Sequence, residues 1–495
     1  MNTVIGIDLG TQSVKVVFYD FEARQFAAIE NAPLDLHQDS NGVAEQESRW
    51  WLDALKDAFA KVDPDVRRSA RAISVSGQQH GFVPVDGSNE VLAPVKLWCD
   101  TSTSAECDEI MDAFGGRNSC IEQVGLPILP GYTASKIRWL GKTGRALYER
   151  MDCILLPHDY INLYLTGERC MEMGDASGTG LLDIRQREWS RPMLRAIDPD
   201  RDLVDCLPQP RLANESIGSL RKDVAEELGL PAGIPTGIGG GDNMMGAVGT
   251  GNVCAGRITM SLGTSGTVYA YADAPIVDPK GTIAAFCSST GGWLPLLCTM
   301  NCTVSTELMR NLIGSGLASF EAQIALADRG ADGVITLPFF NGERTPNLPN
   351  AKGCLVGLSS QNMKPENLLR SAMEGATFAL KSGIDELASL GVQADEIVVT
   401  GGGAKSDKWR QLVADICAAP VVAVEQDEGA AFGAALQALQ IIEPGSGIEE
   451  LVDEHLTRDV LRCCEPRNAA VSDYQDFYAN YQRAVGAITE LYSQE

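Results

Sequence analysis

The sequence is short of positive charge. Its 495 residues include 40 Lys and Arg against 66 Asp and Glu, which gives a formal net charge of −26. Non-specific binding to nucleic acid, or to an anionic membrane surface, needs clustered Lys and Arg, so this balance argues against both partners. A phosphate-bearing ligand stays open, because backbone N–H groups and helix N-termini bind phosphate without net positive charge.

Several other features are missing. No apolar run approaches the ~20 residues of a membrane-spanning helix, and the first residues lack the basic and apolar segments of a signal peptide. The 14 cysteines are scattered without a Cys-x-x-Cys pair, and there are four histidines with no His-x-x-x-His pattern. We therefore expect free thiols, a cytoplasmic protein and no structural zinc site. The absence of G-x-x-x-x-G-K-[ST] excludes a P-loop.

The residues present predict an α/β fold. Hydrophobic residues make up 44% and charged residues 21% of the chain, as in ordinary globular proteins. The length predicts two to four domains or two large lobes. Strand-like and helix-like segments alternate throughout. The clearest predicted strands are 4–8, 14–19, 72–76 and 396–400, and the clearest predicted helices are 48–62, 135–147, 367–390 and 472–491.

One segment resembles another about half the chain length away. Ile5–Asp20 can be laid on Ile258–Asp273, and Leu-Gly-Thr falls at 9–11 and at 262–264. Both copies are predicted to be a strand, a turn of small residues and a second strand. A repeat on this scale predicts two related lobes rather than a solenoid, whose repeats are ~20–50 residues long. Chance similarity between two hairpins is the alternative.

The first of these turns has the composition of a phosphate-binding turn. Thr11, Gln12 and Ser13 follow a glycine, so their amides and hydroxyls can face phosphate oxygens. Asp8 precedes the turn and can hold Mg²⁺ directly or through water. Lys15 follows it and can reach a phosphate as a point charge.

Two later turns offer similar groups. Gly263, Thr264 and Ser265 form the second copy of the repeat, without the acid. A third glycine-rich turn includes Gly402 and Gly403 and follows a predicted strand. The two copies of the repeat predict a phosphate chain held between two lobes. The third turn is either a nucleotide contact or a plain helix start with glycines for packing.

An acid in a glycine-rich segment is the sharpest catalytic candidate. Asp242 follows three glycines, and Asn243 follows it. A carboxylate between flexible glycines can lie close to a bound hydroxyl, and phosphoryl transfer needs a group that orients that hydroxyl and accepts its proton. The alternative is an acid that only caps the helix after it.

Two longer patterns resemble a known family. Gly353-x-Leu-x-Gly-Leu358 followed by Asn367-Leu-x-x-Ser-Ala-Met-Glu374 resembles the C-terminal signature of the FGGY carbohydrate kinases. Gly131-x-Thr-x-x-Lys-Ile-x-Trp-Leu140 fits most of their N-terminal signature, although Thr143 departs from its last position. The resemblance covers roughly Val4 to Leu436.

This resemblance implies a fold and an assignment of roles. The family has two actin-like (ribonuclease H-like) α/β lobes of the sugar kinase, Hsp70 and actin superfamily, with a cleft between them. Residues 1–250 are then the lobe with the sugar site and the catalytic acid, and 251–495 the nucleotide lobe. The resemblance makes Asp242 the catalytic base and Asp8 the Mg²⁺-linked acid. It places nucleotide contacts at Thr264, Asn301, Gly402, Gly403 and Asp407.

Within the family the chain resembles the xylulokinases. Ser76–Gly81 is similar to their Gly-Gln-Met-His-Gly with Gln79 in place of Met, and Leu97–Asp100 is similar to Leu-Trp-Asn-Asp with Cys99 in place of Asn. Asn341–Pro346 is similar to Ser-Gly-Glu-Arg-Thr-Pro. The implied sugar-binding residues are Gln79, His80, Trp98, Asp100, Asp242, Asn243, Glu343 and Arg344. For the last two, a structural ion pair is the alternative.

The expected activity is ATP-dependent phosphorylation of a pentulose, D-xylulose to D-xylulose 5-phosphate, with Mg²⁺. The partners are then a sugar and a nucleotide, and the resemblance is compatible with a homodimer. Glycerol kinases carry Arg-Glu where this chain has Gln79-His80, and a Tyr where it has Gly131. Kinases for ribulose, L-xylulose, erythrulose or glycerol remain alternatives, as does a non-enzymatic nucleotide switch of the actin or Hsp70 type. The sequence leaves open the ketose, the oligomeric state, regulation and the role of 440–495.

Overall fold

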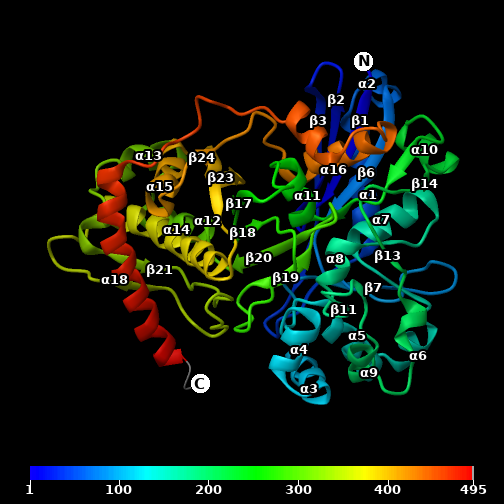
Figure 1. Cartoon of the computed structure of the whole chain (residues 1–495), viewed down its shortest axis with the longest axis horizontal. Coiled ribbons are helices and arrows are strands. Elements are labelled where there is room, and N and C mark those ends of the chain that lie inside the picture. The colour runs from blue at the N-terminus through cyan, green and yellow to red at the C-terminus, as the bar shows by residue number, and fades with distance from the viewer. Residues whose placement is uncertain (493–495) are drawn as a thin grey trace. The chain divides into compact units, whose positions relative to one another are not determined.

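The computed structural model describes residues 1–492, and these form two compact units, each a mixture of strands and helices (Figure 1). Unit 1 comprises Met1–Cys254, Tyr271–Pro295 and Glu428–Leu456. Unit 2 comprises Ala255–Ala270, Leu296–Asp427 and the described residues from Thr457 onwards. Each unit is therefore assembled from three separate stretches of chain. The expected roles of 1–250 in sugar binding and of 251–495 in nucleotide binding stay predictions.

Unit 1 is built on a mixed sheet in the order β14-β15-β6-β1-β2-β3, and β16 also pairs with β6. β1 and β2 form an antiparallel hairpin, while β6 runs parallel to β1. The predicted strands 4–8, 14–19 and 72–76 lie within β1, β2 and β6. Their bounds are β1 (Thr3–Leu9), β2 (Ser13–Asp20), β3 (Gln25–Pro33), β6 (Ala70–Gly77), β14 (Ser216–Ser219), β15 (Pro235–Gly237) and β16 (Gly240–Gly241).

The two faces of this sheet are covered by different helices. Side chains alternate along a strand, and Ile5, Ile7 and Leu9 of β1 pack in one buried cluster with residues of α1 (Ser48–Lys61). Gly6, between them, faces α16 (Gly429–Ile442): a Cβ on Gly6 would lie 1.9 Å from the Ala431 carbonyl oxygen. The helix can therefore approach β1 only because position 6 has no side chain.

α16 also crosses α11 (Asp242–Gly249) at glycines. A Cβ on Gly433 would lie 1.8 Å from the Met245 carbonyl oxygen, and a Cβ on Gly249 would lie 2.0 Å from the Gly429 carbonyl oxygen. The two backbones are thus in direct contact. Because Asp242 begins α11, this crossing sets where its carboxylate lies.

Unit 2 repeats the topology of unit 1. Strands of its sheet run in the order β20-β18-β17-β23-β24, with β17 and β18 an antiparallel hairpin and β23 parallel to β17. β1, β2 and β6 have the same arrangement, so the repeat predicted from Leu-Gly-Thr is confirmed as a structural repeat. The bounds are β17 (Gly256–Leu262), β18 (Gly266–Ala270), β20 (Trp293–Thr299), β23 (Ala394–Thr400) and β24 (Val421–Val422).

The long helices of unit 2 lie at the residues predicted. Figure 1 shows α18 in red, and it packs on α14 and α15. Tyr474 and Tyr481 of α18 are buried. The bounds are α12 (Thr303–Ile313), α13 (Leu317–Ile324), α14 (Pro365–Ser389), α15 (Asp407–Cys417) and α18 (Asn468–Tyr492), with the short strands β21 (Ile335–Leu337) and β22 (Cys354–Val356).

One predicted helix is wrong in its extent. The segment 135–147 is divided into α5 (Thr133–Thr143) and α6 (Arg145–Arg150), because Gly144 leaves the helical region at φ −130° and ψ 47°. Other helices of unit 1 are α2 (Pro64–Arg68), α3 (Ser104–Phe114), α4 (Arg117–Val124), α7 (Pro157–Thr166), α8 (Met173–Ser177), α9 (Arg191–Ile197), α10 (Lys222–Leu228) and α17 (Ile448–His455). Its short strands are β4 (His37–Gln38), β5 (Ala44–Gln46), β7 (Val83–Val85), β8 (Val95–Lys96), β9 (Cys153–Leu155), β10 (Met171–Glu172), β11 (Leu182–Asp183), β12 (Glu188–Trp189), β13 (Pro210–Arg211) and β19 (Ala284–Cys287).

Within residues 1–492, no helix has both the length and the apolar character needed to cross a membrane. The fourteen cysteines all lie in this part of the chain as free thiols, and seven of them are buried.

The α11–α16 crossing predicts a stability effect. Gly433→Ala should lower the free energy of unfolding by about 1–3 kcal/mol, because the new methyl group cannot fit against the Met245 carbonyl. The midpoint of thermal unfolding would report the loss. Gly445→Ala is the control, since a Cβ there meets nothing within 4 Å. Equal midpoints for the two variants would show that the crossing is not tight.

Candidate active site

The ends of neighbouring parallel strands bring two acids into one place in unit 1. Asp8 near the end of β1 lies opposite Ser76 of β6, and Gly240 of β16 lies opposite the same Ser76 on its other side. The Ser76 hydroxyl donates a 3.0 Å hydrogen bond to the Asp8 carboxylate. Asp242 follows β16 directly, so it emerges at the same edge of the sheet.

Asp242 is half-buried at the start of α11. Its Oδ1 accepts hydrogen bonds from the backbone N–H of Asn243 at 2.8 Å and from the Asn243 side chain at 3.0 Å. Burial, together with repulsion from the carboxylates of Asp8 and Asp175, raises the pKa of Asp242 to about 7. A carboxylate that takes up a proton near neutral pH is suited to general base catalysis. The N-cap of α11 is Gly241, and Asp242 is the first helical residue.

Asp8 lies among charged groups. Burial raises its pKa, while the Lys15 ammonium, opposite it on β2, acts in the other direction. The Lys15 Nζ donates to Glu428 at 2.8 Å. No cluster of three or more His, Cys, Asp or Glu side chains among residues 1–492 is arranged to hold a metal ion. A cation at Asp8 would therefore take most of its ligands from water and from a bound phosphate.

The Gln79-His80 loop contacts Asn243, the residue after Asp242, and its role in sugar binding stays a prediction. The Gln79 Oε1 accepts a 2.8 Å hydrogen bond from the Asn243 side chain. His80 has a left-handed backbone with φ of 64°, and its ring packs on Tyr132 at 5.2 Å between centroids. The Lys136 ammonium, from the N-terminal signature, donates to the His80 carbonyl at 2.9 Å. The signature lysine therefore holds the loop in place.

A buried acid that we did not predict supports this loop. Asp175 on α8 lies 3.2 Å from the Nδ1 of His80, and its other oxygen lies 3.4 Å from the Nδ1 of His158. The Nε2 of His158 lies 3.0 Å from Asp159. Burial alone would lower the pKa of His158, but the two carboxylates raise it well above its ordinary value. His158 is thus buried between two acids that favour its protonated form.

Asp175 carried only a weak signal in the sequence. It stands among small residues, Gly174 and Ala176 to Gly178, as Asp242 does, but far from His80 along the chain. Nothing local links the two segments. Gly178 has to be small, because a Cβ there would lie 2.0 Å from the His80 ring.

Two other predicted sugar-binding residues of unit 1, Trp98 and Asp100, form hydrogen bonds with groups of the protein itself. The Trp98 indole donates to the Thr11 hydroxyl at 2.9 Å, which joins a predicted sugar residue to the predicted phosphate turn. Asp100 is fully buried, and its carboxylate accepts from the Ala44 amide at 2.9 Å and from Lys96 at 3.0 Å. Asp100 therefore fixes the local chain, and its contact with sugar stays a prediction. Gln12 is exposed and Ser13 half-buried at the turn.

In unit 2 the two glycine-rich turns lie side by side. Gly263, Thr264 and Ser265 connect β17 to β18, and Thr264 is exposed. Gly401, at the end of β23, has φ of 87°, and a Cβ on it would lie 3.0 Å from the Leu262 backbone. Gly402 and Gly403 continue from there. Asp407 follows, mostly exposed, and forms an ion pair with Arg410.

Glu343 and Asn301 contact each other. The Glu343 carboxylate accepts from the Met300 amide at 2.7 Å and from the Asn301 side chain at 3.2 Å. No side-chain ion pair joins Glu343 to Arg344 in the described chain; the Arg344 backbone N–H donates to that carboxylate at 2.8 Å instead. The alternative of a structural ion pair is therefore wrong. Contacts of Asn301 with nucleotide, and of Glu343 and Arg344 with sugar, stay predictions.

Comparison with known proteins shows the family to which the chain belongs. A sequence model of the N-terminal domain of the FGGY family of carbohydrate kinases matches residues 3–249, and the model of its C-terminal domain matches residues 258–440. The chain is 40% identical to a xylulose kinase of Haemophilus influenzae, over 96% of this chain and 98% of that protein. It is 34% identical to a xylulose kinase of Escherichia coli, over 91% and 92%.

A solved structure described as a xyloylose kinase from Brucella ovis superimposes with a TM-score of 0.90 at 29% identity, over 99% of this chain and 100% of that one. The predicted α/β fold of the sugar kinase, Hsp70 and actin superfamily is confirmed by this match and by the repeated hairpin topology. The chain belongs to the FGGY family of carbohydrate kinases and is an ATP-dependent sugar kinase.

Proposed function

We propose that this kinase transfers the γ-phosphate of ATP to the terminal hydroxyl of D-xylulose, giving D-xylulose 5-phosphate. The observation that carries the proposal is the pair Asp8 and Asp242 at the same sheet edge, with Gln79 and Asn243 beside them. The relatives named xylulose kinase support the choice of sugar.

In this proposal Asp242 orients the attacking hydroxyl and accepts its proton. Phosphoryl transfer asks the protein mainly for positioning and for stabilisation of charge. The raised pKa of Asp242, about 7, matches that task, because the group is deprotonated in part at neutral pH and still basic enough to take the proton. Asn243 holds one carboxylate oxygen, which leaves the other for the substrate.

Asp8 is proposed to hold Mg²⁺, directly or through water. The residues fit such an ion: burial raises the pKa of Asp8, the Asp8 carboxylate raises the pKa of Asp242, and a cation would relieve both effects. When bound, Mg²⁺ would neutralise charge on the phosphates of ATP. We propose that Lys15 and the turn at Thr11 to Ser13 face those phosphates, and that Thr264, Gly402 and Gly403 contact the nucleotide.

Asp175 is proposed as a positioning residue for the sugar-binding loop. It approaches both the side chain of Gln79, at 3.4 Å, and the ring of His80. His158 and Asp159 hold Asp175 from behind. Buried polar groups of this kind are stable only when their partners are in place. The cluster therefore gives the loop one defined position.

Asp242→Asn tests the catalytic base. The kcat for sugar phosphorylation should fall about 10²–10⁴-fold, because the amide cannot accept the proton. The KM for ATP and the thermal unfolding midpoint should stay near their wild-type values. Asp53→Asn, on the exposed face of α1, is the matched control. A kcat within a few-fold of the wild-type value would show that Asp242 is not the base.

The pH dependence follows from the same carboxylate. The base works only when deprotonated, so kcat/KM for the sugar should fall about tenfold per pH unit below a midpoint near pH 7. An ordinary carboxyl would place that midpoint near 4. Raising the Mg²⁺ concentration should lower the midpoint, because a cation at Asp8 offsets the repulsion. A profile that stays flat from pH 7 down to pH 5 would contradict the assignment.

A sugar panel tests the substrate. ADP release from Mg-ATP should be measured with D-xylulose, L-xylulose, D-ribulose, L-ribulose, erythrulose, glycerol and no sugar. We expect kcat/KM for D-xylulose to exceed the others at least tenfold, or ~1.4 kcal/mol of transition-state preference. Another preferred sugar would keep the kinase assignment and change the substrate.

The same panel with Gln79→Met tests the pocket residue that departs from the xylulokinase pattern. Loss of the hydrogen bond to Asn243 should change the ratio of kcat/KM values between sugars. An unchanged ratio would show that position 79 does not select the substrate.

A further inference from the structure

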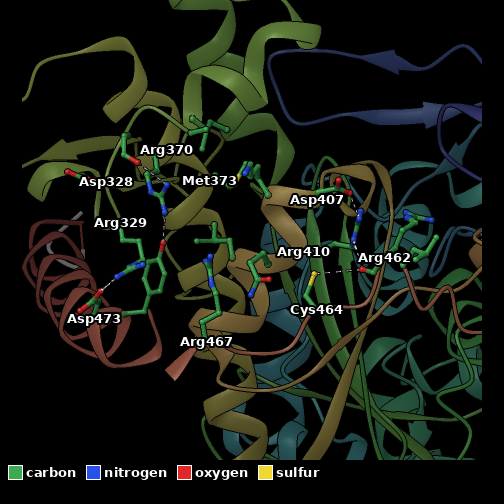
Figure 2. A pocket seen from close by; sticks show the side chains of 18 residues that line it. Asp328, Arg329, Arg370, Met373, Asp407, Arg410, Arg462, Cys464, Arg467 and Asp473 are labelled. Carbon is green, nitrogen blue, oxygen red and sulfur yellow. Dashed lines mark hydrogen bonds and ion pairs between the residues drawn. The ribbon is translucent and has the colours of Figure 1, made fainter. Parts of the chain in front are cut away.

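A pocket of about 790 Å³ lies wholly within unit 2, among residues that no role above uses except Asp407. Its walls come from the end of α13 and the turn after it, from α14, from the first turns of α15, and from residues 461–474 (Figure 2). This volume is within the range of small-molecule sites, roughly 300–1,000 Å³.

The charge of the pocket is opposite to that of the chain. Among the described residues that line it, six are Lys or Arg and three are Asp, whereas the whole sequence has 40 basic and 66 acidic residues. The basic residues are Arg329, Arg370, Lys408, Arg410, Arg462 and Arg467.

The acids that pair with two of these arginines do not line the pocket. Arg370 donates to Glu374 at 2.7 Å, and Arg467 forms an ion pair with Asp415; both carboxylates are buried behind the wall. Arg370 and Arg467 line the cavity (Figure 2), and the Arg370 guanidinium also donates to the Ala327 carbonyl and the Tyr474 hydroxyl. Buried acids thus hold these cations in position while the pocket keeps its positive lining.

Two further cations are only weakly engaged. Arg462 lies 3.8 Å from both Asp427 and Asp459, which is long for an ion pair, and its side chain is 29% exposed. Lys408 is exposed and makes no ion pair or side-chain hydrogen bond with the described residues. Of the lining acids, Asp473 is paired with Arg329 and Asp407 with Arg410.

We propose that this pocket binds a phosphorylated small molecule, at a site that shares only Asp407 with the predicted sugar and nucleotide contacts. Guanidinium groups hold phosphate oxygens with paired N–H donors, and Arg clusters are the usual protein partner of phosphate. Met373 and Leu412 line the same cavity and offer an apolar surface to the carbon skeleton.

The pocket is joined to the third glycine-rich turn. Arg410 donates to the Ala404 carbonyl at 2.6 Å, and Arg462 donates to the same oxygen at 3.4 Å. Ala404 directly follows Gly402 and Gly403. A phosphate that engages Arg462 therefore acts on the residues that support this turn, and we expect it to change the KM for ATP without occupying the nucleotide site.

Direct binding is the test, because it does not depend on the sugar that the kinase uses. Calorimetric titration of the full chain with inorganic phosphate, and with glycerol 3-phosphate, should show one saturable site with a Kd at or below about 1 mM. The double variant Arg462→Gln/Lys408→Gln should weaken it at least tenfold. These residues are chosen because neither leaves a buried acid unpaired, as Arg467→Gln would. The control Lys352→Gln/Arg483→Gln removes the same charge from exposed positions of the same unit.

The site should persist in Asp242→Asn and with Mg-ADP at saturation, so that failure of the proposed catalytic base and failure of this proposal are distinguishable. Equal affinity in the two double variants, or no saturable binding of either probe, would overturn it. Loss of binding when Mg-ADP saturates the enzyme would overturn it too, by making the pocket part of the nucleotide site.

Discussion

Direct backbone contact between α16 and the rest of unit 1 is the constraint on which the site depends. α16 meets β1 at Gly6 and crosses α11 at Gly249 and Gly433, and in all three places a methyl group would overlap a carbonyl oxygen. Asp8 lies two residues after Gly6, and Asp242 begins α11. The two carboxylates are therefore placed by a helix that enters the sequence only at residue 429. Unit 1 is complete only after the chain has passed through most of unit 2.

The close placement of these acids raises the pKa of Asp242, and a raised pKa suits a general base. Burial raises the pKa of both acids, and repulsion from Asp8 and Asp175 helps to raise the pKa of Asp242 to about 7. In water the same group would be ionised and a poor base. Asp175 shows the opposite outcome, because hydrogen bonds from His158 and His80 lower its pKa although burial opposes this. The pKa values of neighbouring carboxylates thus shift in opposite directions because their partners differ.

Strands and turns were predicted correctly where the local residue pattern and the tertiary packing favour the same element. The β-branched runs at 4–8 and 14–19 became β1 and β2, and the glycine-rich turns stand where their composition placed them. The helix predicted over 135–147 was wrong because one glycine, Gly144, interrupts a continuous apolar period. Asp175 was missed because its partners, His80 and His158, lie on separate segments, and no local periodicity records such a contact.

The sequence by itself determined the kinds of chemistry available: a repeated hairpin with small residues at its turn, an acid among glycines, and the two signatures of a carbohydrate kinase family. These are local, since a turn or a strand depends on a few neighbouring residues. Tertiary structure alone decided which groups meet. It places the Gln79 side chain within hydrogen-bond distance of Asn243, and the buried Asp100 carboxylate against the Ala44 amide. It also places several arginines around one pocket, although the chain as a whole is acidic. The reason is physical: pKa values, ion pairs and cavities depend on distances between side chains, and packing of remote segments sets those distances.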